Sequence, residues 1–389
     1  MGQTRSGAKT SNDASSQYWP ANPFFNLLPA SRWQVQYPDG RPIALCAVWS
    51  TYVLPVYGGV NLIKGLLPAW AGSGGAKGDT LALTLTDHSV RYVLASKSDE
   101  RGATIAAWGA ELRGNQTRDA FMKRIKTLLP SAGRVIAVLD PADYQIVQIE
   151  SPNVPPEELN SAVRWRATEF VDGSPHDYTL DVLAVSGEPE RPANVIAVLA
   201  HNDIVRARML DCQALGRPLS VIDVVETSQR NLLNAVLLFG PTSPSVAALL
   251  VAAAGRALMV IAIRGQLYFF RRFEFDADTL AVTVDEIQAA LVGSSASEDS
   301  ASRSLTQLHR SLDLWEDSYP NLPLATLLVE AGSKTAAIIS RLKPETGVET
   351  RPLILSTVFK LPPSKASPPW LDPAYLPLLG ALLRPVEVE

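Results

Sequence analysis

The chain has 389 residues, of which 47% are hydrophobic and 19% are charged, and its formal net charge at pH 7 is -4. This length allows two or three domains with well-filled cores. Because Lys and Arg are scattered and outnumbered by acidic residues, we expect no nucleic-acid partner. Cys46 and Cys212 are far apart in apolar or helical contexts, which favours two small buried side chains over a disulfide.

The first part of the chain differs in composition from the rest. Met1–Gln17 is polar and lacks the apolar core of a signal peptide, so we expect a flexible tail. Pro42–Ile63 carries no charge, but Pro55 and two glycines interrupt it. This favours a segment that seeks an interface over a membrane-spanning helix. Gly72–Gly78 is a flexible linker by composition.

Regular elements are predicted from residue 80 onward. Thr80–Ser96 alternates apolar and polar residues around Asp87-His88-Ser89, which predicts a β-hairpin with its turn there. Ala103–Leu112 predicts a third strand, and the apolar spacing of Arg118–Leu129 predicts a helix.

Residues 135–185 predict a strand, a turn, a second strand and a helix whose start is marked by Pro155 and Pro156. The apolar residues expected on one buried face of this helix are Leu159, Ala162, Val163, Ala167 and Phe170. Val195–Ala200 then predicts a buried strand. The next expected elements are a helix over Ile204–Leu215, capped by Asn202 or Asp203 and stopped by Gly216, and a strand over Ser220–Val225.

The second half repeats this order, which indicates an internal duplication. Ser245–Phe275 predicts a meander with its first turn at Ala254-Gly255, in which Tyr268, Phe269 and Phe270 form a buried aromatic face and Arg271-Arg272 a solvated one. The remaining expectations are a mobile loop at Gly293–Ser304, a helix through Leu305, Leu308, Leu312 and Trp315, a strand at Thr326–Glu330, a helix at Lys334–Leu342, a linker at Leu361–Pro369 and a terminal helix at Leu376–Leu383.

Residues 135–185 also carry a family resemblance. They read LD at 139–140, DYQ at 143–145, VPPEEL at 154–159, AVRW at 162–165, EF at 169–170 and DVL at 181–183. This order resembles the cytoplasmic actin-like proteins of type IV pilus assembly, the PilM class, and within it the MshI branch. The resemblance implies a two-lobed α/β fold with mixed sheets, the duplicated ribonuclease H-like fold of actin. It divides the chain into an extension at 1–78, lobe I at 79–240 and lobe II at 241–389.

In actin-like ATPases, glycine-bearing turns and acidic side chains hold a nucleotide and Mg²⁺ between the lobes. The matching positions here are degenerate. The first turn reads Thr84-Leu85-Thr86-Asp87-His88-Ser89 without glycine, the second reads Ala252-Ala253-Ala254-Gly255 without a carboxylate, and the third reads Glu330-Ala331-Gly332-Ser333 with one glycine. We therefore expect no ATP hydrolysis, no catalytic residue and no cofactor, with weak ATP binding left open. The four histidines, His88, His176, His201 and His309, are dispersed and predict no metal site.

A short motif in the extension points to a partner. Phe25-Asn26-Leu27-Leu28-Pro29 resembles the Asn-Leu-Leu-Pro signature at the cytoplasmic start of PilN, the membrane partner of PilM. Proline pre-orders an extended backbone and the leucines can fill pockets, as docking peptides do. The alternative is that these apolar residues only anchor the extension to the body. If the motif docks, it can fill a groove of its own chain or of a second copy, the latter giving a homo-oligomer.

The sequence thus favours a non-catalytic, actin-like scaffold of an MSHA-type pilus platform, peripheral to the cytoplasmic side of the inner membrane, with a PilN-like partner. The groove that binds the partner is expected near Leu81–Ser96 and Val135–Ile149. One alternative is a nucleotide-driven ATPase with atypical loops. Another is the cytoplasmic part of a type II secretion platform protein, a class with a membrane span after its actin-like part. Because this chain ends soon after Arg384, the pilus role is favoured.

Overall fold

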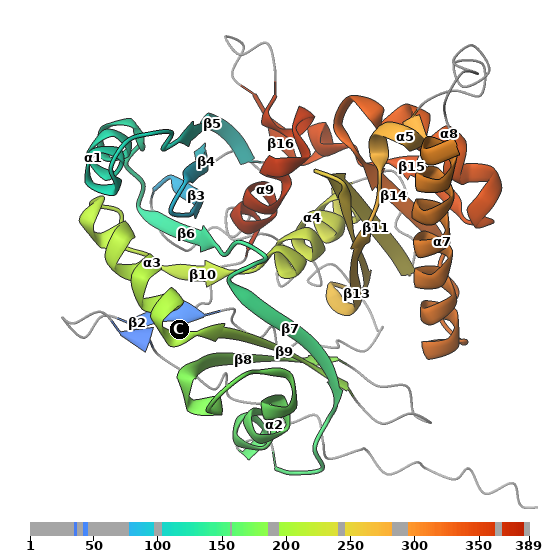
Figure 1. The fold of residues 1–389 in the computed structure, drawn as a ribbon, viewed down its shortest axis with the longest axis horizontal. Helices are drawn as coiled ribbons and strands as arrows, with labels where there is room; N and C mark the ends of the chain where they lie inside the picture. The colour runs from blue at the N-terminus through green and yellow to red at the C-terminus, as the bar shows by residue number, and fades with distance from the viewer. Residues whose placement is uncertain are drawn as a thin grey trace, which may run out of the picture.

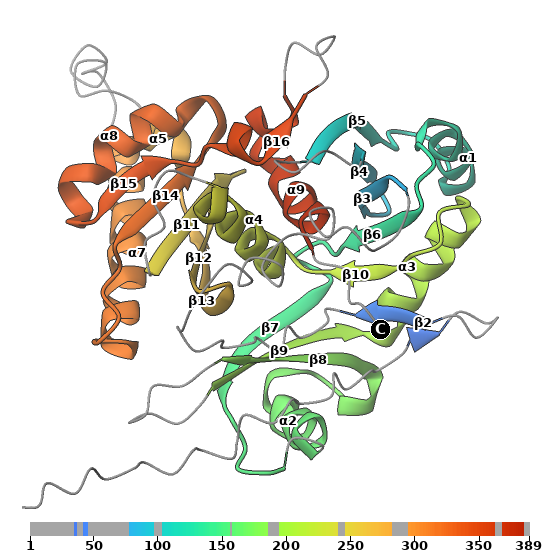
Figure 2. The ribbon, with the colours of Figure 1, turned by 180° about the vertical axis from the view of Figure 1, so that it is seen from behind.

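The computed structural model describes residues 35–36, 42–45, 78–96, 103–155, 158–185, 194–239, 246–281, 295–361 and 368–384. These residues form two α/β lobes, with a smaller three-stranded sheet attached to the first (Figure 1). Seen from behind, helix α4 (Val225–Phe239) lies between the two large sheets (Figure 2). Within the described residues, no helix is both long and apolar enough to cross a lipid bilayer.

The first lobe is built on an eight-stranded sheet with the order β1-β2-β10-β6-β3-β4-β5-β16. Its strands are β1 (Val35–Gln36), β2 (Pro42–Leu45), β3 (Thr80–Leu85), β4 (Ser89–Ser96), β5 (Ala103–Leu112), β6 (Arg134–Val138), β10 (Val221–Asp223) and β16 (Phe359–Lys360). The predicted hairpin and third strand are confirmed, because β3, β4 and β5 form an antiparallel meander. Strand β3 also pairs with β6 in parallel, so its apolar run is buried on both faces.

Part of the predicted extension belongs to this sheet. Strand β2 lies parallel to β10, with Ala44 opposite Val221 and Leu45 opposite Ile222. Strand β1 then pairs with β2 in antiparallel fashion. The extension therefore covers the outer edge of β10, which would otherwise present unpaired backbone groups. The rest of Pro42–Ile63 lies outside the described residues.

The helices of the first lobe begin and end at recognisable caps. Helix α1 (Arg118–Leu128) begins after Thr117, whose side chain accepts a hydrogen bond from the backbone N–H of Ala120. Helix α3 (Asn202–Ala214) is capped by His201, whose ring accepts from the N–H of Asp203, so the expectation of Asn202 or Asp203 as the cap is wrong. Its predicted stop at Gly216 is confirmed by a φ of 71°.

The segment between β6 and α3 forms a small sheet with the order β7-β9-β8. Its elements are β7 (Tyr144–Glu150), α2 (Leu159–Ala167), the 3-10 turns η3 (Thr168–Phe170) and η4 (Pro175–Asp177), β8 (Tyr178–Val185) and β9 (Asn194–His201). Val163 and Ala167 of α2 are buried against this sheet, as predicted. Phe170 is 43% exposed, so its predicted burial is wrong. The helix ends at Ala167, and the tighter 3-10 turn that follows rotates Phe170 away from the buried face.

The second lobe contains a five-stranded sheet with the order β13-β12-β11-β14-β15. Its elements are β11 (Val246–Ala253), β12 (Arg256–Ile263), β13 (Gln266–Glu274), α5 (Ala277–Ala281), α7 (Ser295–Ser318), β14 (Thr326–Glu330), η5 (Gly332–Lys334), α8 (Thr335–Thr346), β15 (Glu349–Pro352) and η6 (Leu355–Thr357). The predicted meander, strand and helix after it are confirmed.

The predicted mobile loop at Gly293–Ser304 is wrong from residue 295 onward, because these residues form the first turns of α7. Ser300 donates a hydrogen bond to the carboxylate of Asp276, at 2.9 Å. Ser304 accepts one from the N–H of Asp276, also at 2.9 Å, and is buried. Asp276 therefore fixes a serine-rich stretch whose composition alone suggests a loop.

The C-terminal elements close the fold between the lobes. They are η7 (Pro369–Leu371), η8 (Pro373–Tyr375) and α9 (Leu376–Leu382), which confirms the predicted terminal helix; residues 362–367 of the predicted linker lie outside the described residues. Helix α9 packs closely on α4 (Figure 1). At Gly380, an added Cβ would lie 3.0 Å from Cα of Ser228 and closer still to its carbonyl group. Only glycine allows the two helices to approach this closely.

Candidate functional site

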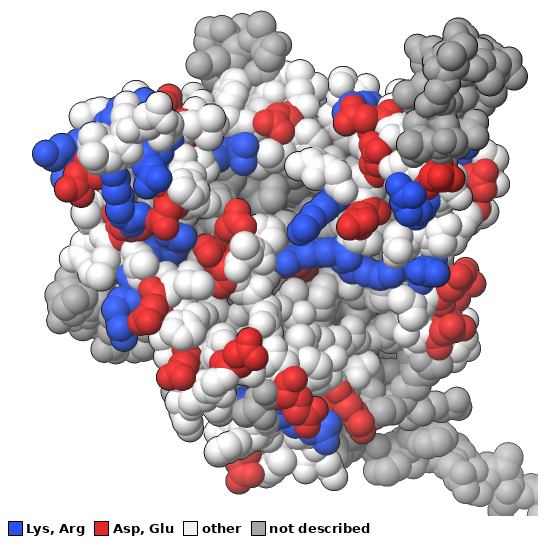
Figure 3. Space-filling model, in the orientation of Figure 1, with Lys and Arg blue, Asp and Glu red and all other residues white. Residues whose placement is uncertain are grey.

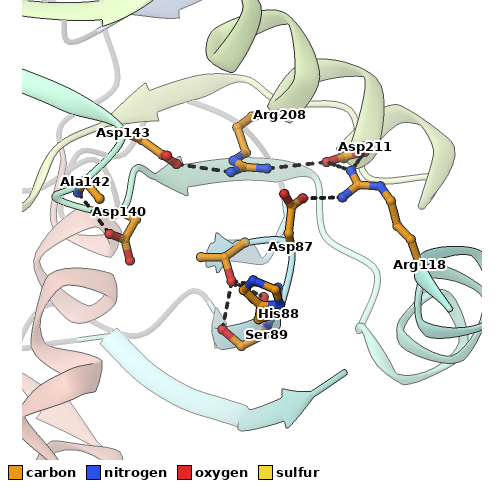
Figure 4. A network of polar contacts seen from close by, with 10 residues as sticks. Asp87, His88, Ser89, Arg118, Asp140, Ala142, Asp143, Arg208 and Asp211 are labelled. Carbon is orange, nitrogen blue, oxygen red and sulfur yellow. Dashed lines mark hydrogen bonds and ion pairs between the residues drawn. The ribbon is translucent and has the colours of Figure 1, made fainter. Parts of the chain in front are cut away.

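The first predicted nucleotide turn is closed by its own side chains. The hydroxyl of Thr86 accepts hydrogen bonds from the backbone N–H groups of His88, at 3.2 Å, and Ser89, at 3.0 Å. Asp87 points outward with 62% of its side chain exposed, and its carboxylate forms an ion pair with Arg118 at the start of α1 (Figure 4). The one acidic side chain of this turn therefore already has an arginine partner.

Arg118 belongs to a chain of ion pairs of alternating sign (Figure 4). Its guanidinium donates to both carboxylate oxygens of Asp211 in α3, at 2.6 and 2.7 Å. The guanidinium of Arg208, also in α3, lies 3.6 Å from the carboxylate of Asp211. It also lies 3.1 Å from the carboxylate of Asp143, the residue just before β7. The hydrogen bond from Arg118 to Asp211 raises the pKa of Arg118. These pairs tie the turn to α1, α3 and the start of β7.

The second turn joins β11 and β12. Ala254 and Gly255 both have positive φ, 51° and 75°, as a two-residue hairpin turn of this kind requires. Ala252 is buried in the sheet. Neither the turn nor the end of β11 offers a carboxylate that could hold the water shell of a divalent cation.

The third turn follows β14 and is covered by the chain itself. Gly332 has a φ of 63°, and an added Cβ would lie 3.0 Å from the carbonyl oxygen of Leu371 and 3.3 Å from Cδ of Pro373. Glu330 accepts hydrogen bonds from the N–H of Gly332, at 2.7 Å, and from the hydroxyl of Thr335, at 3.2 Å. Burial raises the pKa of Glu330. The η7–η8 segment thus lies against Gly332, while Ser333 beside it is exposed.

The residues at these three turns do not fit a magnesium nucleotide. In the first turn, the carboxylate is paired with an arginine. The second turn has no carboxylate, and in the third turn Leu371 and Pro373 lie against Gly332. Among the described residues, no group of three or more His, Cys, Asp and Glu side chains could hold a metal ion. On the face in Figure 3, acidic and basic side chains are interspersed, with no broad area of one sign.

A buried cluster that the sequence did not predict lies between the lobes. Glu226, at the start of α4, has no exposed surface. The hydroxyl of Tyr144 donates to it at 2.6 Å, and Arg272 from β13 of lobe II forms an ion pair with it, also at 2.6 Å. Arg272 donates to the Tyr144 hydroxyl as well, and its guanidinium carbon lies 4.9 Å from the centre of the Tyr144 ring. We call Tyr144, Glu226 and Arg272 the interlobe cluster.

In the interlobe cluster, a fully buried carboxylate forms an ion pair with a partly exposed arginine. The backbone N–H of Val225 donates to the Tyr144 hydroxyl at 3.1 Å, so this hydroxyl links three groups from two lobes. Burial, with Glu226 next, raises the pKa of Tyr144 well above its ordinary value, so the phenol stays protonated. Arg272 therefore has a specific partner across the lobes while it remains exposed to solvent, as expected for its face of β13.

A second buried ion pair lies close by in the sequence. Arg384 Nη1 is 3.1 Å from an oxygen of Asp223, and both side chains are almost completely buried. Asp223 also accepts hydrogen bonds from the Thr227 hydroxyl and the Val224 N–H. Burial alone would raise the pKa of Asp223, but Arg384 and these hydrogen bonds, with Arg230, lower it overall.

These residues were missed because each pairs with a partner far away in the sequence. The signal available was the polar run Glu226–Asn231, which begins at the third residue after the end of strand β10. The other predicted site, Phe25-Asn26-Leu27-Leu28-Pro29, lies outside the described residues, so its role stays a prediction.

No family model and no curated protein matches the chain. Among solved structures, it is similar to the PilM-PilN type IV pilus biogenesis complex, with a TM-score of 0.59 and 20% identity over 79% of this chain and 99% of that one. It also matches the cytoplasmic domain of EpsL, an inner membrane component of the type II secretion system of Vibrio cholerae, with a TM-score of 0.41 and 13% identity over 78% and 94%. A Bacteroides thetaiotaomicron protein with an actin-like ATPase fold matches with a TM-score of 0.42 and 11% identity over 77% and 96%. The chain has a two-lobed α/β actin-like fold similar to that of PilM.

Proposed function

We propose that the protein is a non-catalytic, actin-like scaffold of a type IV pilus assembly platform, of the MshI kind that serves MSHA pili. It works at the cytoplasmic side of the inner membrane and joins platform proteins. The observation that carries this proposal is the likeness to PilM, which spans 99% of the PilM-PilN chain matched. The residues at 139–183 that resemble the PilM class support it independently.

The partner in this proposal is a PilN-like membrane protein. The matched structure is a complex of PilM with PilN, and the motif Phe25–Pro29 resembles the docking signature of PilN. The surface expected to take the partner is the part of the first lobe near Leu81–Ser96 and Val135–Ile149. A second copy of the chain can supply the same motif in trans.

The absence of ATP hydrolysis is part of the proposal. It is supported by the ion pair of Asp87 with Arg118, by the lack of a carboxylate at Ala254-Gly255, and by the packing of Leu371 and Pro373 over Gly332. An ATPase would need an open carboxylate to organise the metal at these turns.

Calorimetric titration with Mg-ATP, together with a phosphate-release assay, tests this part. We expect neither hydrolysis nor submicromolar binding. Mg²⁺-dependent hydrolysis that Asp87→Asn abolishes, while Asp119→Asn on the neighbouring helix leaves it intact, would establish the alternative of an ATPase with atypical loops.

The partner is tested by binding a peptide from the cytoplasmic start of a PilN-like protein to the full chain. A variant lacking residues 1–34 keeps β1 and is the natural comparison. If the extension fills its own groove, the deletion should increase peptide affinity, and Leu27→Ser with Leu28→Ser should do the same. Failure of the peptide to bind either chain would contradict the proposed partner.

A further inference from the structure

The first turns of α4 are unusual because they are both polar and buried. Glu226, Thr227, Ser228, Gln229, Arg230 and Asn231 follow one another, and each is at most 8% exposed. The hydroxyl of Ser228 and the side-chain oxygen of Gln229 are buried and have no hydrogen-bond partner. Buried polar groups without partners lose the hydrogen bonds that water would give them. The start of α4 therefore already carries a cost in free energy.

Helix α4 is the element at which the two lobes meet. It follows β10 of the first lobe and packs on β11, β12 and β13 of the second. In both views it lies between the two large sheets (Figure 1 and Figure 2). The polar start of α4 is therefore part of the interface between lobes.

Arg272 opposes this separation. It reaches from β13 to Glu226 at 2.6 Å and to the Tyr144 hydroxyl. Glu226 is fully buried, whereas the side chain of Arg272 is 31% exposed. Removing the arginine while Glu226 stays buried would leave an uncompensated charge. The contact between the lobes therefore depends on this pair staying intact.

The third member of the cluster connects it to the three-stranded sheet. Tyr144 is the first residue of β7, and Gln148 on the same strand donates to the Tyr319 hydroxyl of lobe II at 3.4 Å. Strand β7 therefore touches the second lobe at two places. A shift of this sheet relative to the lobes would move Tyr144 and disturb the pair of Glu226 with Arg272.

We propose that the interlobe cluster is a latch: it holds the lobes closed over the polar start of α4, and displacement of the β7-β9-β8 sheet opens it. A ligand that binds this sheet and prefers one of the two states would be coupled to lobe opening, with equal and reciprocal effects. The inference concerns the relative motion of the lobes and does not depend on the pilus role.

The latch is tested by native-state hydrogen exchange of the full chain, resolved by peptide. In Arg272→Gln, we expect exchange of the amides at 226–231 to rise by about tenfold or more, because opening frees the start of α4. The amides of α8 at 336–342, inside the second lobe, should keep their wild-type rates. Arg256→Gln, an exposed arginine on neighbouring β12, is the matched control and should change neither region.

A second measurement is the distance between the lobes, taken between spin labels on the exposed positions 119 in α1 and 302 in α7. The labels are attached in a Cys46→Ser background. Arg272→Gln should add a population with a changed interlobe distance. A uniform rise in exchange over both regions would mean that Arg272 only stabilises the fold, which overturns the latch. Unchanged exchange at 226–231 with an unchanged distance distribution would also overturn it.

Discussion

The buried pair of Asp223 with Arg384 gives the sharpest stability prediction. In Arg384→Met, the new side chain is of similar length but uncharged, so the Asp223 carboxylate stays buried and loses the charged partner that lies 3.1 Å from it. Breaking a buried pair on one side costs about 3–5 kcal/mol. This is a large share of the roughly 5–15 kcal/mol that a folded protein has in total.

Urea unfolding followed by circular dichroism measures this loss. The double variant Arg384→Met with Asp223→Asn removes the isolated charge, so it should recover part of the stability. Recovery in the double variant would assign the loss to the charge and not to packing. A loss below about 1 kcal/mol for Arg384→Met would refute the reasoning, because it would mean that Asp223 is not desolvated in the folded state.

The same pair predicts a pH dependence. In the wild type, the folded pKa of Asp223 is below its ordinary value, so its contribution to stability is present above about pH 4 and is lost as the pH falls through the folded pKa. Without Arg384, burial would raise this pKa, so lowering the pH should protonate Asp223 in the folded variant and relieve the cost of its buried charge, and the stability gap to the wild type should narrow as the pH falls. Unfolding curves between pH 3 and 7 compare the two. Parallel pH profiles would contradict the assignment.

Three further changes test the packing and the caps. Gly380→Ala should lower the free energy of unfolding in urea by several kcal/mol, because the added Cβ has no room against α4. Gly255→Ala is the comparison: its Cβ meets no atom within 4 Å, so it should cost only about 1–2 kcal/mol of backbone strain. Equal losses would contradict the close contact. Thr117→Ala removes the cap of α1 and should cost about 0.5–2 kcal/mol, with no loss counting against the cap. Burial raises the pKa of Cys212 to about 12, so in Cys46→Ser a thiol reagent should label the protein only after unfolding; prompt labelling at pH 8 would show that this thiol is accessible.

The sequence predicts the elements whose side chains follow a regular pattern. Alternation sets the meander β3-β4-β5, and the apolar run at Thr326–Glu330 matches β14 to the residue. Helix α4 was not predicted, because its buried first turns are polar and carry no apolar stripe. The start of α7 was predicted as a loop, because serines favour turns unless a distant group such as Asp276 bonds them.

The candidate site was predictable only where it consists of one short segment. The turns at Asp87 and Ala254-Gly255 lie where the hairpin pattern puts them. The cover over Gly332 comes from residues almost forty positions later, and the partner of Arg272 lies in the other lobe. Such pairs depend on how the lobes pack, which no local pattern in one sequence records.

The central claim is that this actin-like fold acts by binding a platform partner and not by turning over nucleotide. The most direct measurement is a titration of the full chain with the cytoplasmic N-terminal peptide of a PilN-like protein, with and without Mg-ATP. We expect the same Kd in both cases. Binding that requires Mg-ATP, or no binding of the peptide either to the full chain or to the variant lacking residues 1–34, would contradict the claim.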